Sequence, residues 1–212
     1  MSGPGVTVFL LSPARCGGER AAQLARSERS ELGAQLHAGR APIGDVFAWL
    51  SALYFRGKLA YALRFGAGAG GAPGALVMAP GLGLRSPDAP ISAAMLRAMG
   101  EVEVESAAFV QPLARDARLL ERAVAEAAGR ARSPAARVVL LGSIATGKYL
   151  DTLLEVFGER LLFPETFVGR GDMSRGGLLL RSARSGEELA YRSVLGATLR
   201  GTRPPKLPRA RP

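Results

Sequence analysis

The segment "RVVLLGSIATGKYLDTLL" (137–154) joins an apolar, β-branched run to an amphipathic one through a turn of small residues. It predicts a buried strand over 137–141, then a helix. From Gly142 to Lys148 the turn meets the G-x-x-x-x-G-K spacing of a phosphate-binding P-loop. The next residue is Tyr149, where that motif has the Ser or Thr that holds magnesium. The segment therefore predicts a strand–turn–helix unit and raises the question of what its turn binds.

Four other apolar runs, each bounded by turn-forming residues, predict further strands. They are "VTVFLL" (6–11), "ALVMA" (75–79), "EVEVESAAFV" (101–110) and "RLLFP" (160–164). Amphipathic segments between them predict helices over 19–36, 43–65, 90–100 and 114–132. Because continuous apolar strands alternate with helices, we expect a Rossmann-like three-layer α/β/α fold with a mostly parallel sheet. Two β-type runs around Ser185 and Gly186 predict a C-terminal β-hairpin over about 176–194.

The positive charge of the chain is concentrated near one end. Residues 200–212 carry five cations and no acid, which is half of the formal net charge of +10. The prolines between these cations predict an extended, disordered basic tail, which leaves residues 1–199 as a single α/β domain. Such a tail either binds the phosphates of DNA or RNA in a salt-dependent way or only improves solubility, and both interpretations stand.

The composition also bears on compartment and cofactors. No apolar run approaches the roughly 20 residues that cross a bilayer, and the N-terminus lacks the basic region of a signal peptide. One cysteine cannot form an intramolecular disulfide, so we expect a cytoplasmic protein with no membrane partner. With a single histidine, His37, and a single cysteine, Cys16, we expect neither a zinc site nor a hydrolase triad, and we predict no metal and no cofactor.

Three predicted strands end in loops of small, turn-forming residues. Open parallel sheets bind ligands at the carboxyl ends of their strands, where glycines let backbone amides approach and helix N-termini favour anions. Tight strand–helix turns need glycine as well, so a purely structural role is the alternative. The ligand-binding residues predicted in these loops are Ser12, Arg15, Gly81, Gly83, Gly142, Ser143, Gly147 and Lys148.

A P-loop NTPase is the least favoured interpretation of the turn after residue 141. Tyr149 is too long to hold magnesium where a small hydroxyl would. No predicted strand ends in Asp, and Glu165 is a poor substitute. Too few strands follow the motif to build the usual sheet. An anion-receptive turn, with Lys148 as its counter-charge, remains open.

Cations also lie within the apolar helix predicted over 43–65. Arg56 and Lys58 flank Gly57, and glycine in a helix interior costs roughly 1 kcal/mol relative to alanine. A break or a close approach at Gly57 would explain its presence and bring both cations near a ligand.

The segment "FVGRGDMSRGG" (167–177) predicts a flexible loop that closes over a ligand. Arg170 and Arg175 would grip its phosphate or carboxylate, with Asp172 between them. The alternative is a loop that enters the hairpin and holds a local ion pair.

Three residues are candidates for catalysis. Asp172 is the first choice for a general acid/base or a contact to a sugar hydroxyl, and Asp45, in the first turn of the helix over 43–65, is the second. Cys16 follows Arg15 and precedes a predicted helix N-terminus, and both would lower the thiol pKa and make it more nucleophilic. A structural role for Cys16 is the alternative.

Several motifs, taken in order, resemble one family. They are "FLLSPARC" (9–16), "LYFRGKLAYA" (53–62), "VMAPGLGLRSPDAPI" (77–91), "VVLLGSIATGKYLDTLL" (138–154) and "FVGRGDMSRGGLLLR" (167–181). Over about residues 6 to 181 the chain is similar to the small α/β domains of uracil-DNA-glycosylase-like topology, found alone and in archaeosine tRNA-guanine transglycosylases. It lacks the Gly-Gln-Asp-Pro-Tyr and His-Pro-Ser loops of typical uracil-DNA glycosylases. The resemblance implies the handling of nucleobases or nucleosides.

These observations lead to one expected function and two alternatives. We expect a nucleotide, nucleoside or nucleobase at the strand-end loops, and an enzyme of this kind would be a glycosidase or transferase acting on nucleic acid or on a glycosidic or phosphate bond. The first alternative is a non-catalytic protein that associates with nucleic acid through its basic tail and the charge of its body. The second is a divergent P-loop NTPase.

Overall fold

A computed structural model of the chain describes residues 5–68, 71–131, 136–144, 147, 149–197 and 201. Lys148 and residues 202–212 of the basic tail lie outside the described residues. The strands are β1 (Thr7–Leu11), β2 (Ala41–Pro42), β3 (Ala75–Ala79), β4 (Gly83–Arg85), β5 (Pro90–Ile91), β6 (Arg137–Leu141), β7 (Leu161–Pro164) and β8 (Tyr191–Ser193). The α-helices are α1 (Glu19–Leu24), α2 (Glu31–His37), α3 (Ile43–Phe65), α4 (Ala93–Gly100), α5 (Ala107–Ala131), α6 (Leu150–Phe157) and α7 (Asp172–Ser185).

A six-stranded sheet in the order β4-β3-β1-β6-β7-β8 forms the centre of the molecule. The four inner strands are parallel, and β4 and β8 pair antiparallel at the two edges. In this register Val8 lies opposite Val138 and Leu11 lies opposite Leu141. The strands β1 and β6 are thus neighbours at the middle of the sheet, and their carboxyl ends lie side by side.

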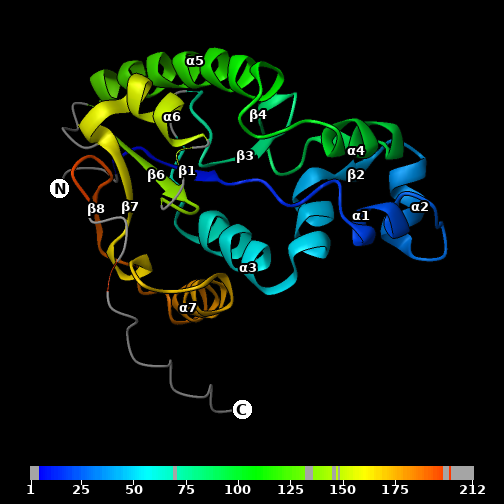
Figure 1. The fold of residues 1–212 in the computed structure, drawn as a ribbon. Coiled ribbons are helices and arrows are strands. Elements are labelled where there is room, and N and C mark those ends of the chain that lie inside the picture. Colours follow the sequence, from blue (N-terminus) through cyan, green and yellow to red (C-terminus); the bar gives the residue numbers. More distant parts are fainter. Residues whose placement is uncertain are drawn as a thin grey trace.

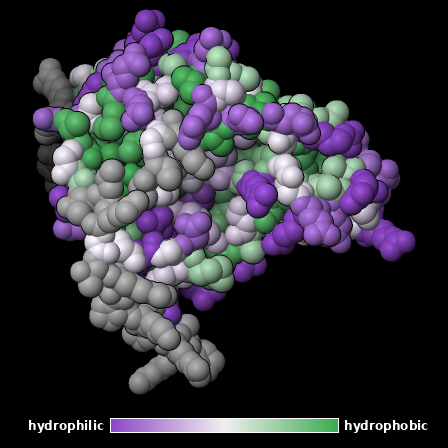
Figure 2. Space-filling view, in the orientation of Figure 1, coloured by the Kyte–Doolittle hydropathy of each residue, from purple (hydrophilic) through white to green (hydrophobic). Residues whose placement is uncertain are grey.

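Helices cover both faces of the sheet. Figure 1 shows α5 and α6 packed over one face and α3 and α7 over the other. Every residue of β1 is buried, as a parallel strand between two helical layers must be. Figure 2 shows hydrophilic side chains along the outer surface where α5 runs, in keeping with its amphipathic pattern. The predicted three-layer α/β/α architecture with a mostly parallel sheet is confirmed.

A smaller unit extends from one end of the sheet. It contains α1, α2, α4 and a two-stranded antiparallel sheet of β2 and β5 (Figure 1). The helix predicted over 19–36 is here divided, because Ser30 caps α2 by accepting a hydrogen bond from the Gly33 amide. Ser92 caps α4 in the same way through the Met95 amide.

Two predicted β segments are corrected. The strand over 101–110 is absent: the Ser106 hydroxyl donates to the Glu103 carbonyl in a turn, and α5 starts at Ala107. The alternating glutamates and valines of this segment have the period-two pattern of a strand, and the prediction was based on that pattern. Residues 172–185 form α7, not an arm of a hairpin, and Gly186 ends that helix in the left-handed conformation at φ 74°. The antiparallel pair at this edge is made by β7 and β8.

The described helices include none that is long and apolar enough to cross a membrane.

Candidate functional site

A cavity of about 580 Å³ opens at the carboxyl ends of β1 and β6, the position expected for a ligand in an open parallel sheet. Five chain segments contribute to its wall: the loop after β1, the helix α3, the segment between α4 and α5, the turn after β6 and the start of α7. The lining residues are Ser12, Pro13, Ala14, Arg15, Ser51, Tyr54, Lys58, Val104, Ser143, Tyr149, Asp172 and Met173. The cavity therefore brings together five of the predicted site residues: Ser12, Arg15, Lys58, Ser143 and Asp172.

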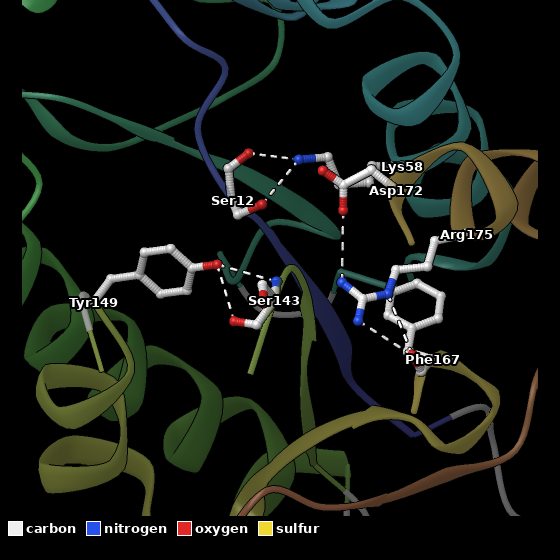
Figure 3. A network of polar contacts seen from close by, with 7 residues as sticks. All are labelled: Ser12, Lys58, Ser143, Tyr149, Phe167, Asp172 and Arg175. Carbon is white, nitrogen blue, oxygen red and sulfur yellow. Dashed lines mark hydrogen bonds and ion pairs between the residues drawn. The ribbon is translucent and has the colours of Figure 1, made fainter. Parts of the chain in front are cut away.

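Lys58 is the most unusual residue of this wall, because its side chain is charged in water and yet only 1% exposed here. Its amine lies 2.7 Å from the Ser12 carbonyl oxygen and 2.9 Å from the Ser12 hydroxyl oxygen (Figure 3). The rings of Tyr54 and Phe55 lie 4.7 Å and 4.6 Å from it. Burial lowers the pKa of Lys58 to about 7, against the opposing effect of the Asp172 carboxylate.

A close helix crossing places Lys58 in the cavity. A Cβ atom at Gly57 would lie 2.6 Å from the Gly176 carbonyl oxygen, and one at Gly176 would lie 2.7 Å from Tyr54 Cα. Only glycine lets α3 and α7 approach so closely. This is the close approach that the sequence predicted at Gly57. It brings Lys58 to the cavity but not Arg56, which is exposed and does not line the cavity.

The helix α3 is strained where it meets the cavity. Ala52 has φ 45° and ψ −119°, which interrupts the helix between Ser51 and Tyr54. A side chain in such a conformation costs of order 1–3 kcal/mol, and strain of this kind clusters at functional sites. The kink separates the first turns of α3 from the part that carries Lys58.

Tyr149 explains the departure from the P-loop pattern. Its ring reaches back into the turn after β6, where its hydroxyl accepts from the Ser143 amide and donates to the Ser143 carbonyl, both at 3.2 Å (Figure 3). A Cβ atom at Gly142 would lie 2.7 Å from this hydroxyl, so Gly142 makes room for it. Burial raises the pKa of Tyr149. In the described part of the turn, an amide that a P-loop would offer to phosphate is thus bound to a tyrosine.

The Tyr54 hydroxyl is buried and makes no hydrogen bond of full geometry with a described residue, although the Arg175 guanidinium lies close enough to interact with it. Burial raises the pKa of Tyr54, and the charge of Arg175 and its contact with the hydroxyl lower it to a smaller extent. Buried hydroxyls are nearly always paired in folded proteins, so the weak pairing of this one on a cavity wall is unusual.

Asp172 lies at the mouth of the cavity, at the start of α7, with its side chain 67% exposed. Its carboxylate lies 3.6 Å from Arg175 Nη1 (Figure 3). Arg175 also donates from Nε and Nη2 to the Phe167 carbonyl and stacks on the Phe167 ring. Arg170 donates to the Thr166 carbonyl and the Ser174 hydroxyl. Both arginines therefore hold the segment that leads into α7, and neither lines the cavity.

Other predicted site residues lie away from the cavity wall. Gly81 and Gly83 form the turn between β3 and β4 with φ of 75° and 86°. At Gly83 a side chain would collide with Asp116, whose carboxylate accepts from the Leu84 amide, so this glycine has a structural role. Asp45 is exposed in the first turn of α3.

The turn before α6 holds two more of the predicted ligand-binding residues. Gly147 is exposed and its carbonyl accepts from the Leu150 amide, while Lys148 lies outside the described residues.

The expected activation of Cys16 is wrong. Its thiol is buried and donates to the Ala14 carbonyl at 3.4 Å. Burial raises its pKa to about 12, whereas the neighbouring arginine and helix were expected to lower it. Cys16 lines a second, smaller cavity of about 170 Å³ together with Leu96 and Arg97.

Four polar or soft residues of the wall were not among the predicted site residues: Ser51, Tyr54, Tyr149 and Met173. One signal was available for Tyr54, because it precedes Lys58 by four residues and so shares its helical face. None was available for Ser51, whose place depends on the kink at Ala52.

Family models, curated proteins and solved structures were compared with this chain, and none of them matches it.

Proposed function

We propose that the cavity at the ends of β1 and β6 binds a small molecule that contains a nucleobase: a base, a nucleoside or a nucleotide. Its volume of about 580 Å³ lies within the range of small-molecule sites. Its wall combines the flat rings of Tyr54 and Tyr149 with hydroxyls of Ser12, Ser51 and Ser143. Planar apolar surface next to a few fixed donors and acceptors suits a flat heterocycle with polar edges.

The observation that carries the proposal is the unpaired Tyr54 hydroxyl on this wall, four residues from the buried Lys58. Lys58 is paired with Ser12, whereas the Tyr54 hydroxyl lacks a hydrogen bond of full geometry, and a ligand atom would supply it. At the mouth, Arg15 is exposed and makes no ion pair with any described residue, which suits a phosphate or carboxylate of the ligand. We assign to Asp172 the contact with a sugar hydroxyl, because its carboxylate is accessible there.

A thermal-shift panel of nucleobases, nucleosides and nucleotides tests the proposal. A ligand present at 100 times its dissociation constant should raise the melting temperature by about 5 °C or more, because it binds only the folded state. Ser51→Trp, which fills the cavity, should abolish the shift. Asp45→Trp, an equally large change at an exposed position of the same helix, should preserve it. The proposal fails if no compound stabilises the protein, or if Ser51→Trp responds as the parent does.

A further inference from the structure

Ser12 and Lys58 are in direct contact within the cavity, and the Tyr149 hydroxyl also hydrogen-bonds to the Ser12 side chain. The Lys58 amine lies 2.9 Å from Ser12 Oγ and 2.7 Å from the Ser12 carbonyl oxygen. A neutral amine satisfies both contacts at once: it donates one N–H to the carbonyl and accepts the hydroxyl proton at its lone pair. Ser12 and Lys58 both line the cavity, where Ser12 is 7% exposed and Lys58 is 1% exposed. The hydroxyl and the amine are therefore next to each other on the cavity wall.

We propose that Ser12 is a nucleophile activated by Lys58, and that the cavity processes the carbonyl group of an ester or amide by acyl transfer. Serine is a weak nucleophile unless an adjacent base takes its proton, and lysine is one of the bases that serve this purpose in hydrolases. The inference uses the cavity of the proposed function, but it concerns a reacting carbonyl and does not require a nucleobase.

The reaction balances without any further reagent. Ser12 Oγ attacks the carbonyl carbon while its proton moves to the lone pair of Lys58 Nζ. The C–O or C–N bond to the leaving group then breaks, and the leaving group takes the proton from the Lys58 ammonium. Water attacks the resulting serine ester, gives its proton to Lys58, and Lys58 returns a proton to Ser12 Oγ. One water is consumed, and an acid and an alcohol or amine are released.

Two features of the surroundings favour this chemistry. Burial between Tyr54 and Phe55 disfavours the protonated amine, so a fraction of Lys58 is neutral near pH 7. The Tyr54 hydroxyl, unpaired among the described residues, is available to donate to the carbonyl oxygen as negative charge develops on it.

Other ionisable groups lie around the pair. Tyr54 from α3 and Tyr149 from the turn before α6 share the cavity wall with it. From α7, the Asp172 carboxylate raises the pKa of Lys58, and Arg175 is paired with that carboxylate.

A small dialkyl fluorophosphate tests the proposal on the full chain, because it reacts with activated serines and releases fluoride. Mass spectrometry should find one adduct, and peptide mapping should place it on Ser12. In the parent protein the labelling rate should rise with pH, with a midpoint near the Lys58 pKa of about 7. Lys58→Met, similar in length but without a base, should label at least roughly 100-fold more slowly. Ser86→Ala, which removes the hydroxyl of an exposed serine outside the cavity wall, should label at the parent rate.

Several outcomes would overturn the proposal: no adduct, an adduct on another residue, or parent-like labelling of Lys58→Met. If Lys58→Met does not fold, the pH profile of the parent decides, because a flat profile or a midpoint above pH 9 contradicts the role of Lys58. Failure here with a positive thermal-shift panel would leave the binding proposal standing. Labelling of Ser12 without any nucleobase response would support acyl transfer and reject the proposed ligand.

Discussion

At the scale of single residues, the cavity is defined by polar groups that the fold buries at a cost. Lys58 and Tyr54 lie on one face of α3, and the fold pairs only the first of them, with Ser12. A protein stabilised by its core alone would place apolar side chains at both positions. Each of the two residues therefore allows a test by substitution.

The first prediction concerns the pH dependence of stability. The pKa of Lys58 is about 7 in the folded state and 10.5 in its ordinary environment. Between these values the unfolded chain binds more protons, so the free energy of unfolding should rise with pH by roughly 1 kcal/mol per pH unit. Above pH 9 the raised pKa of Cys16 acts in the opposite direction. Denaturant titrations at pH 7, 8 and 9 should show the rise in the parent, and Lys58→Met should lack it. Equal slopes in both proteins would contradict the assignment.

The second prediction concerns the unpaired hydroxyl. Tyr54→Phe removes a buried group that has no partner among the described residues, so it should leave the free energy of unfolding unchanged or raise it by about 1 kcal/mol. The same change should weaken binding of any stabilising nucleoside by about 5-fold or more, because the ligand loses a hydrogen bond. Calorimetric unfolding and titration measure the two effects. A clear loss of stability would show that the hydroxyl has a structural partner.

At the scale of elements, the sequence predicts the continuous apolar strands well. The strands β1, β3, β6 and β7 lie where runs of buried residues indicate them, because each is covered on both faces. The positions of short edge strands and of helix caps depend on local contacts, which the pattern of apolar residues does not show. The segment 101–110 has the alternation of a strand, yet it forms a turn and the start of α5. Residues 172–185 form a helix because Gly176 allows packing against α3.

The third prediction tests this helix crossing. Gly176→Ala would place a Cβ atom 2.7 Å from both the Leu53 carbonyl oxygen and Tyr54 Cα, which are backbone atoms that cannot yield alone. We expect it to lower the free energy of unfolding by roughly 1–3 kcal/mol, as overpacking does. Gly171→Ala, at the first position before the same helix, meets no atom within 4 Å and serves as the control. Denaturant midpoints that match for the two variants would contradict the close crossing.

At the scale of the whole molecule, the predicted site is partly assembled. Ser12 and Ser143 meet because adjacent parallel strands end at one edge of the sheet, which the sequence pattern indicates. Lys58 and Asp172 join them from the helices α3 and α7, which cross closely at Gly57 and Gly176. Gly81 and Gly83 do not join them, because β3 turns directly into the antiparallel strand β4. This strand is too short for the alternation of its side chains to predict it. Tyr149 reaches the cavity because its side chain folds back onto the turn after β6, and Ser51 reaches it because α3 is kinked. Both are tertiary features that a sequence pattern does not predict.

The fourth prediction belongs to the charge of the whole chain. Deleting residues 200–212 removes five cations and, by our expectation, reduces salt-dependent binding to DNA or RNA without changing the response to nucleosides. Fluorescence anisotropy with a short labelled oligonucleotide at several salt concentrations measures the first effect, and the thermal-shift panel measures the second. Loss of the nucleoside response in the truncated protein would show that the tail is part of the ligand site.

The most direct measurement of the central claim uses the methionine methyl groups as local probes. Met173 lines the cavity and is 68% exposed, while Met95 and Met99 lie on α4, whose Leu96 and Arg97 line the second cavity. In a ¹³C-methyl NMR titration with nucleosides and nucleotides, our account expects the Met173 resonance to move and those of Met95 and Met99 to stay. Shifts at Met95 or Met99 with Met173 unmoved, or no shift with any compound, would contradict it.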